Sequence, residues 1–250
     1  MEDLDRPREV PGAAAGILAT LERFGFEWDG AIVHQSARSE LYETALRRLH
    51  DAQLTFACTC SRAQLDDELR YPGNCRHRAL TAGPDTAIRL AVEPQRITFT
   101  DRIQGTYRQD VAAAVGDIVL KRRDQLYAYV LAVVVDDAQQ GVTHVVRGAD
   151  LLDNTPRQIL LQQLLGLPEP RYAHVPVLTE ADGAKLAKSR RSVHLDPDFA
   201  LPQLLSVFSM LGLTPPAALK QGPLSTAWTW AIGHWSSDWV PKRLNLPVND

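Results

Sequence analysis

Three cysteines form the clearest chemical cluster in the sequence: Cys58, Cys60 and Cys75. A structural zinc ion takes four nitrogen, sulfur or oxygen donors in a tetrahedron, so three thiolates leave one position to fill. His77, two residues after Cys75, and Tyr71, four residues before it, are the candidates. Because tyrosine is an unusual zinc ligand, the spacing alone favours His77. The pattern predicts a zinc knuckle, and the alternative is three buried free thiols.

A pair of lysines in a turn is the second candidate for chemistry. Lys185 and Lys188 lie in the segment Asp182-Gly-Ala-Lys-Leu-Ala-Lys-Ser189. Two ammonium groups on one side of a tight loop suit a triphosphate whose negative charge grows as pyrophosphate leaves. The alternative is an ordinary Lys-x-x-Lys loop at the surface with no ligand.

An arginine at the end of a predicted strand is the third candidate. Arg147 follows the apolar segment 143–146 and precedes Gly148. In open α/β sheets the ligand crevice lies at the strand ends, and a guanidinium there can clamp a substrate carboxylate. Tyr129 could cover the same pocket. The alternatives are a surface arginine and a core tyrosine.

The elements that would position these residues alternate between strands and helices. Apolar residues at three- and four-residue spacing predict helices at 12–24, 38–52, 155–165 and 200–213. Alternating or continuous apolar runs predict strands within 87–100, 117–135 and 143–146, while 54–80 is expected to be irregular. This order predicts an α/β fold with a largely parallel sheet. A small helical unit is expected to end the chain. Its tryptophans, Trp228, Trp230, Trp235 and Trp239, are expected to form a packing core, and the alternative is a stacking platform for bases.

The composition is that of an ordinary globular protein: of 250 residues, 45% are hydrophobic and 23% are charged. The formal net charge of -3 excludes a polycationic chain, so nucleic acid would bind at a local basic patch such as 121–123 or 188–191. The acidic N-terminus does not match a signal peptide, and the apolar run 127–135 is too short to span a membrane. An odd number of cysteines argues against a disulfide framework. We therefore expect a cytoplasmic protein.

Eight motifs in a fixed order resemble those of the glutamyl-queuosine tRNA(Asp) synthetases, which are short bacterial paralogues of glutamyl-tRNA synthetase. The resemblance covers almost the whole chain and is strongest over residues 1–200. The motifs are Glu2-Asp-Leu-Asp5, Pro7-Arg-Glu-Val-Pro-Gly12, the cysteine cluster with Tyr71, Leu126-Tyr-Ala-Tyr129, Val146-Arg-Gly-Ala-Asp-Leu-Leu152, Thr155-Pro-Arg-Gln158, Tyr172-Ala-His-Val-Pro176 and Lys185-Leu-Ala-Lys-Ser189.

The resemblance implies a Rossmann-like class I synthetase catalytic domain over residues 1–197, with a zinc-binding insertion at about 54–80 and a helical subdomain at 198–250. It implies that the enzyme uses ATP to make glutamyl-adenylate and then passes glutamate to the queuosine base in the anticodon of tRNA(Asp).

 The activation step is expected to use Mg²⁺ on the ATP phosphates. The expected partners are L-glutamate, ATP and queuosine-containing tRNA(Asp), and the expected state is a monomer.

The resemblance also assigns roles to residues. By position, Glu2, Tyr129 and Arg147 match residues that bind glutamate. Lys188 matches the ATP-contacting lysine of the loop that contains Lys185, and both are expected to stabilise the transition state. Cys58, Cys60, Tyr71 and Cys75 match the zinc ligands, so the resemblance favours Tyr71 over His77.

One part of the family pattern is missing. The family opens with a strand, a Pro-x-Gly turn and a HIGH-like motif whose helix N-terminus cradles ATP, and no such motif occurs in this sequence. We expect that the true protein begins roughly 40 residues earlier, the length of a strand, a turn and a helix. Two alternatives stay open: a non-catalytic module that binds tRNA or zinc, and a fragment of an ordinary glutamyl-tRNA synthetase.

Overall fold

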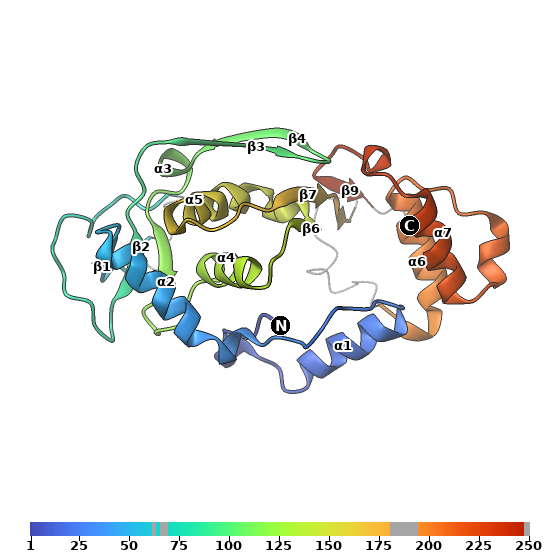
Figure 1. Cartoon of the computed structure of the whole chain (residues 1–250), viewed down its shortest axis with the longest axis horizontal. Coiled ribbons are helices and arrows are strands. Elements are labelled where there is room, and N and C mark those ends of the chain that lie inside the picture. Colours follow the sequence, from blue (N-terminus) through green and yellow to red (C-terminus); the bar gives the residue numbers. More distant parts are fainter. Residues whose placement is uncertain (62–63, 66–69, 181–194, 248–250) are drawn as a thin grey trace.

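Three helices pack against one another in the half of the molecule that Figure 1 shows on the left, with α5 above α4 and α2 to the left of α4. The computed structural model describes residues 1–61, 64–65, 70–180 and 195–247. Helix α2 spans Ser39–Asp51, α4 spans Tyr129–Gln139 and α5 spans Thr155–Leu165. Pro156 lies in the first turn of α5 and Gly166, at φ +61°, caps its end, as expected for these residue types.

The main core lies between these helices and the strands beside them. One face of α2 is buried at helical spacing through Tyr42, Ala45, Leu46 and Leu49. Helix α5 is buried on almost every side, so it is an internal helix and not a surface one. The predicted helices at 38–52 and 155–165 are confirmed.

The strands form several small sheets. Strands β1 (Thr55–Cys58), β2 (Ala87–Leu90) and β5 (Ile118–Lys121) pair antiparallel in the order β1-β2-β5. Strands β3 (Arg96–Asp101) and β4 (Gly105–Asp110) form a hairpin, followed by the short helix α3 (Val111–Ala114). The expectation of a largely parallel sheet is therefore wrong for this half of the chain.

Two parallel pairs complete the strands. Strand β6 (His144–Gly148) pairs in parallel with β7 (Arg171–Val175), and α5 makes the crossover between them. Strand β8 (Val177–Thr179) pairs in parallel with β9 (Asn245–Pro247). The β6-α5-β7 unit has the α/β arrangement that the alternating sequence pattern predicted.

Three assignments made from the sequence need correction. The apolar run 129–135 belongs to helix α4 and not to a strand, because periodicity cannot distinguish a buried helix from a buried strand. The predicted buried strand at 143–146 is a strand, but Val146 is 63% exposed. The segment 54–80, expected to be irregular, contains β1.

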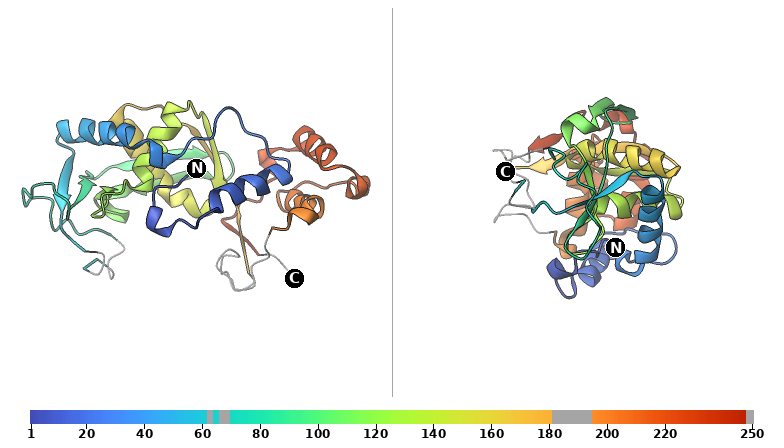
Figure 2. Two further views of the ribbon diagram at one scale, coloured as in Figure 1. Left: turned by 90° about the horizontal axis from the view of Figure 1, so that it is seen from below. Right: turned by 90° about the vertical axis from the view of Figure 1, so that its left-hand side faces the viewer.

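A helical unit lies at one end of the molecule, opposite β1 and β2 (Figures 1 and 2). It contains α6 (Ala200–Met210) and α7 (Leu224–His234), and α1 (Ala13–Arg23) packs beside it. Trp228 donates from Nε1 to the carbonyl oxygen of Phe24 at 2.8 Å and contacts Phe208 edge-on. Within the described part of the chain, no helix has both the length and the apolarity to cross a membrane.

The tryptophan core is only half confirmed. Trp228 and Trp230 pack against the buried residues of α6 and α7. Trp235 and Trp239 are 45% and 53% exposed, so the expectation that all four pack in a core is wrong. The extended backbone at Trp235 ends α7 and directs the chain away from the core.

A buried carboxylate joins α2 to α4. Asp136 accepts hydrogen bonds from Gln35 Nε2 at 2.9 Å, Arg38 Nε at 2.7 Å and the Tyr42 hydroxyl at 2.8 Å. Asp136 is 5% exposed, and a buried charge is tolerated only when it is paired and hydrogen-bonded. The three donors therefore determine how α2 and the segment before it sit on α4.

Tyr42→Phe is expected to lower the free energy of unfolding by about 1–2 kcal/mol, because it removes one hydrogen bond to a charged group and leaves the ring packed. Urea unfolding followed by circular dichroism measures this change. Tyr127→Phe is the matched control, since the Tyr127 hydroxyl donates to the partly exposed Glu43 and should contribute less. Equal losses in the two variants would contradict a special role for Asp136.

Candidate functional site

The three cysteines of the predicted knuckle lie close enough together to hold a metal ion. The Cys60 and Cys75 sulfurs are 3.6 Å apart, and the three cysteine sulfurs lie within 4.8 Å of one another. The Tyr71 hydroxyl oxygen is 3.4 Å from the Cys58 sulfur and 4.0 Å from the Cys60 sulfur. Zinc–sulfur bonds of about 2.3 Å in a tetrahedron place sulfurs about 3.8 Å apart. These residues therefore fit a zinc ion.

The fourth donor nearest to the thiols is Tyr71 and not His77. Tyr71 is buried, and its oxygen also accepts a hydrogen bond from the Cys75 backbone amide at 3.0 Å. The Arg89 guanidinium lies 3.7 Å from the centre of the Tyr71 ring and holds it in place. His77 is exposed and lies outside the cluster of metal-binding side chains found among the described residues.

A glycine permits the close approach that positions Tyr71. The Tyr71 amide donates to the Val115 carbonyl oxygen at 2.9 Å. Gly116 has φ +74°, and a Cβ atom there would lie 2.3 Å from the Tyr71 carbonyl oxygen. Only glycine fits both the left-handed backbone and this contact, so the segment before β5 supports the knuckle directly.

The side chains of the knuckle differ in the direction of their pKa shifts. Burial raises the pKa of Cys60 to about 11. Burial also opposes ionisation of Cys75, but the Thr59 backbone amide and the Cys60 and Tyr71 side chains donate hydrogen bonds and lower the pKa of Cys75 to about 6. Burial and the Cys58 thiol raise the pKa of Tyr71. Because metal binding requires deprotonated ligands, a zinc ion would have to displace protons from Cys60 and Tyr71.

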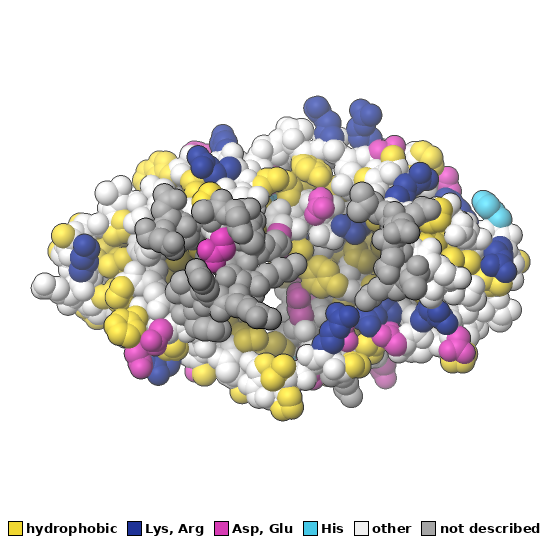
Figure 3. Space-filling view, turned by 180° about the vertical axis from the view of Figure 1, so that it is seen from behind, with side chains coloured by type: hydrophobic (Ala, Val, Ile, Leu, Met, Phe, Trp, Pro, Cys, Tyr) yellow, Lys and Arg dark blue, Asp and Glu magenta, His cyan; other side chains and the backbone are white. Residues whose placement is uncertain are grey.

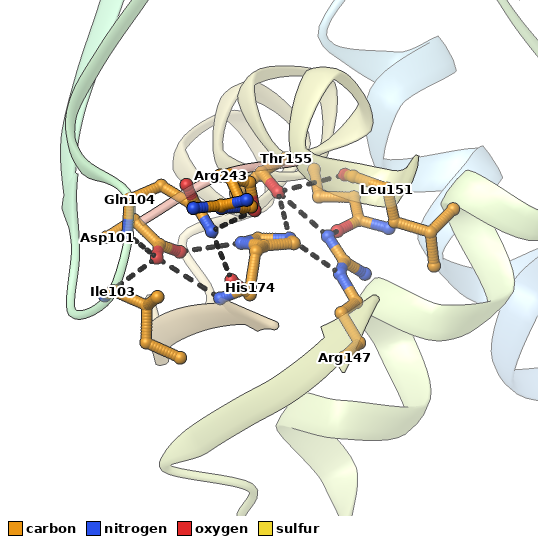
Figure 4. Close-up of polar contacts among 9 residues, drawn as sticks. Asp101, Ile103, Gln104, Arg147, Leu151, Thr155, His174 and Arg243 are labelled. Carbon is orange, nitrogen blue, oxygen red and sulfur yellow. Dashed lines mark hydrogen bonds and ion pairs between the residues drawn. The ribbon is translucent and has the colours of Figure 1, made fainter. Parts of the chain in front are cut away.

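Arg147 lies in β6 and is held by three uncharged acceptors (Figure 4). Its Nε donates to His174 Nε2 at 3.1 Å, and its Nη2 donates to Thr155 Oγ1 at 2.9 Å and to Gln158 Oε1 at 2.6 Å. Among the described residues, no acidic side chain lies within ion-pair distance of Arg147. No neighbouring carboxylate among the described residues therefore neutralises the guanidinium charge, which is available to pair with a bound anion.

The structure brings the other two predicted glutamate-binding residues into the electrostatic range of Arg147. Burial raises the pKa of Tyr129, the first residue of α4; the charge of Glu2 raises it further and Arg147 lowers it. Burial raises the pKa of Glu2 as well, although the terminal amine and Arg147 oppose this shift. Glu2 and Tyr129 therefore lie near enough to Arg147 to interact with its charge.

The N-terminal segment that carries Glu2 is tied to the segment before α2. The Met1 terminal amine donates to the Val33 carbonyl oxygen at 2.6 Å, and the Gln35 amide donates to the Met1 carbonyl oxygen at 3.0 Å. The Asp3 carboxylate accepts from the Ser36 amide at 2.9 Å. These bonds on Met1 and Asp3 fix the backbone on both sides of Glu2.

The lysine loop cannot be placed beside these residues. Lys185 and Lys188 lie outside the described residues, as does the basic stretch 188–191. The other predicted basic run is described and is engaged within the protein. Lys121 pairs with Glu43, Arg122 with Asp5, and Arg123 donates to a backbone carbonyl. Figure 3 shows the face opposite to that of Figure 1, hollowed at its centre, with basic and acidic side chains around the hollow.

Three residues of the site were not assigned from sequence. Asp137, on α4, is partly buried; burial and the nearby charges of Asp136 and Glu2 raise its pKa to about 6, against the opposing charge of Arg147. Asp101 and His174 are buried behind Arg147. His174 stands in the motif Tyr172-Ala-His-Val-Pro176, which was the only signal in the sequence, and nothing there connects it to Asp101.

Comparison with known proteins places the chain among tRNA synthetases. Residues 1–215 match the family described as tRNA synthetases class I (E and Q), catalytic domain. The chain is 52% identical over 248 residues to the glutamyl-Q tRNA(Asp) synthetase of Pseudomonas fluorescens, covering 99% of this chain and 83% of the relative. It is also 52% identical over 248 residues to the protein of the same name from Pseudomonas aeruginosa, covering 84% of that relative.

Solved structures of glutamate-tRNA synthetases have the same fold. The enzyme from Elizabethkingia anophelis superimposes with a TM-score of 0.77 at 21% identity, covering 99% of this chain. The enzyme from Elizabethkingia meningosepticum, solved with its amino acid, gives a TM-score of 0.74 at 20% identity. The chain spans 60% and 59% of the lengths of these two structures.

Proposed function

Because the chain belongs to the glutamyl-Q tRNA(Asp) synthetases, within the class I tRNA synthetase family, we propose that it activates L-glutamate with ATP and transfers it to queuosine in the anticodon of tRNA(Asp). The chain is a ligase, and its likeness to the solved glutamate-tRNA synthetases confirms the predicted class I α/β fold. The single observation that carries the substrate is Arg147, a partly buried cation held only by neutral acceptors among the described residues.

Each proposed glutamate contact follows from the charges at the site. Arg147 pairs with a substrate carboxylate, which a guanidinium binds with geometric specificity. Glu2 accepts the substrate ammonium group; its raised pKa indicates a carboxylate that gains from a new positive neighbour. Tyr129 donates a hydrogen bond from its hydroxyl, since burial keeps the phenol protonated. Together these groups position the α-carboxylate for attack.

Activation is an in-line attack of the glutamate α-carboxylate on the α-phosphorus of ATP, with pyrophosphate as the leaving group. Such phosphoryl chemistry depends on positioning and charge neutralisation and needs no covalent group on the protein. Lys185 and Lys188 are proposed to neutralise the phosphates, with Mg²⁺ on the ATP. The cysteines have no part in this step.

The knuckle is proposed to hold zinc through Cys58, Cys60, Cys75 and Tyr71, because the distances among their donor atoms fit a tetrahedron. A zinc ion with four protein ligands is structural and contributes to folding. It would close the insertion at 54–80 within a catalytic domain at 1–197. Residues 198–250 are proposed to form the helical subdomain.

Glutamate-dependent ATP–pyrophosphate exchange tests the activation step, and transfer of radiolabelled glutamate to tRNA(Asp) tests the acceptor. We expect exchange with glutamate but not with glutamine, and transfer to tRNA(Asp) with queuosine but not to the same tRNA with guanosine at that position. Charging of tRNA(Glu) would indicate an ordinary glutamyl-tRNA synthetase activity. Binding of tRNA(Asp) without exchange would indicate a non-catalytic module.

A further inference from the structure

A buried histidine connects Arg147 to a buried carboxylate on another strand (Figure 4). His174, in the centre of β7, is 0% exposed, and Asp101, at the end of β3, is 2% exposed. The Nδ1 atom of His174 lies 2.6 Å from Asp101 Oδ2, and its Nε2 atom lies 3.1 Å from Arg147 Nε. The three side chains form one line of hydrogen bonds from β3 through β7 to β6.

Asp101 is arranged to be a permanent anion. Its Oδ1 accepts from the backbone amides of Ile103 at 3.0 Å, Gln104 at 2.9 Å and His174 at 3.1 Å. Burial opposes ionisation, but the His174 side chain and these amides lower the pKa of Asp101. A carboxylate in this state accepts hydrogen bonds only, so His174 carries its proton on Nδ1.

This tautomer leaves His174 Nε2 as an acceptor, which is what Arg147 requires. A guanidinium has N–H donors and no acceptor, so its Nε can bond to His174 only while Nε2 has no proton. Thr155 and Gln158 occupy the Nη2 side. Another neighbour of the guanidinium is the Tyr129 side chain, whose hydrogen bond with Arg147 opposes the rise in the Tyr129 pKa.

His174 also separates the Asp101 carboxylate from the Arg147 guanidinium. A carboxylate in direct contact with Arg147 would neutralise the guanidinium and compete with a substrate carboxylate. With His174 interposed, Asp101 orients the arginine through a neutral ring. A donor group fixed in advance in its bound orientation loses less entropy when the ligand binds.

We propose that Asp101 and His174 are positioning residues for glutamate binding, in which the carboxylate fixes the imidazole tautomer and the imidazole fixes the orientation of Arg147. This inference rests on the proposed role of Arg147 and adds two residues that do not touch the substrate. Removal of either residue should therefore weaken glutamate binding and leave the ATP step unaffected.

Asp101→Asn provides the sharpest test, because it keeps the shape and reverses the tautomer. The new amide can donate to His174 Nδ1, which moves the proton to Nε2 and places two N–H donors face to face at Arg147. We expect the KM for glutamate in pyrophosphate exchange to rise about 10- to 100-fold, as for other residues that orient a ligand-binding group, with the KM for ATP and kcat changed less than threefold. A merely structural loss would lower kcat or the folded fraction and would not shift the KM for one substrate.

Nitrogen-15 NMR of histidine-labelled protein reads the tautomer without any activity. We expect a protonated Nδ1 and a bare Nε2 on His174 in the unaltered chain, and the reverse in Asp101→Asn. His174→Gln is the second variant, since a glutamine oxygen can accept from Arg147 Nε; it should keep the KM for glutamate within about fivefold, whereas His174→Leu should not. Tyr172→Phe, which removes only the hydroxyl that bonds to Gln162, is the matched control with unchanged kinetics.

The outcomes separate this inference from the proposed function. A reversed tautomer in Asp101→Asn with an unchanged KM for glutamate overturns the positioning role, as does a proton on Nε2 in the unaltered chain. If Arg147→Ala also leaves the KM for glutamate unchanged, the proposed glutamate site itself fails. If Asp101→Asn does not fold, the contrast between His174→Gln and His174→Leu decides the question.

Discussion

Arg147→Ala is expected to reduce kcat/KM for glutamate in ATP–pyrophosphate exchange by about 100- to 1000-fold. The reason is that truncating one partner of a desolvated, hydrogen-bonded charge pair costs about 2–5 kcal/mol. The variant also leaves His174 Nε2, Thr155 and Gln158 without their shared donor. Steady-state exchange at varied glutamate concentration measures the loss, and calorimetry of glutamate binding separates affinity from rate.

Two further variants test whether the loss in Arg147→Ala comes from the guanidinium of this residue. Arg147→Lys keeps the charge but lacks the planar fork that bonds to three acceptors at once, so it should remain well below the unaltered chain. Arg171→Ala removes an exposed arginine from β7, beside His144 of β6, and should leave the kinetics unchanged. Full exchange activity in Arg147→Ala would rule out this residue as the carboxylate contact.

Cys75→Ala is expected to abolish stoichiometric zinc binding. Structural zinc sites bind with about 10–16 kcal/mol, or roughly 3 kcal/mol for each of four ligands, so the loss of one ligand should weaken affinity by about 100-fold or more. The insertion should become sensitive to protease, because zinc in such a site contributes to local folding. Zinc content by mass spectrometry after dialysis, together with limited proteolysis, measures both effects.

The identity of the fourth ligand is tested by a matched pair. Tyr71→Phe keeps the ring that packs under Arg89 and removes only the oxygen near the Cys58 sulfur, so zinc affinity should fall. His77→Ala removes an exposed side chain and should leave zinc affinity unchanged. The opposite result would restore His77 as the ligand.

The pattern of residue types was enough to predict four of the helices, at 12–24, 38–52, 155–165 and 200–213, and the chemical candidates. The predicted helices at 38–52 and 155–165 agree closely with α2 and α5, because their apolar spacing and end residues act locally. The apolar run 129–135 was assigned to a strand and is helical, because a continuous apolar run has no period to read. The antiparallel pairing of β1, β2 and β5 could not be predicted from the sequence pattern either, because the direction of strand pairing depends on contacts between distant segments.

The sequence by itself determined which side chains were available for chemistry: the CxC and third cysteine, the tyrosine before it, and an arginine at a strand end. Only the tertiary structure showed that Tyr71, and not His77, lies beside the cysteine sulfurs. Spacing along the chain does not determine which of the two side chains points toward them. Only it brought Asp101 behind His174, across a separation of 73 residues. Hydrogen bonds depend on distance and direction in space, and those are properties of the folded chain.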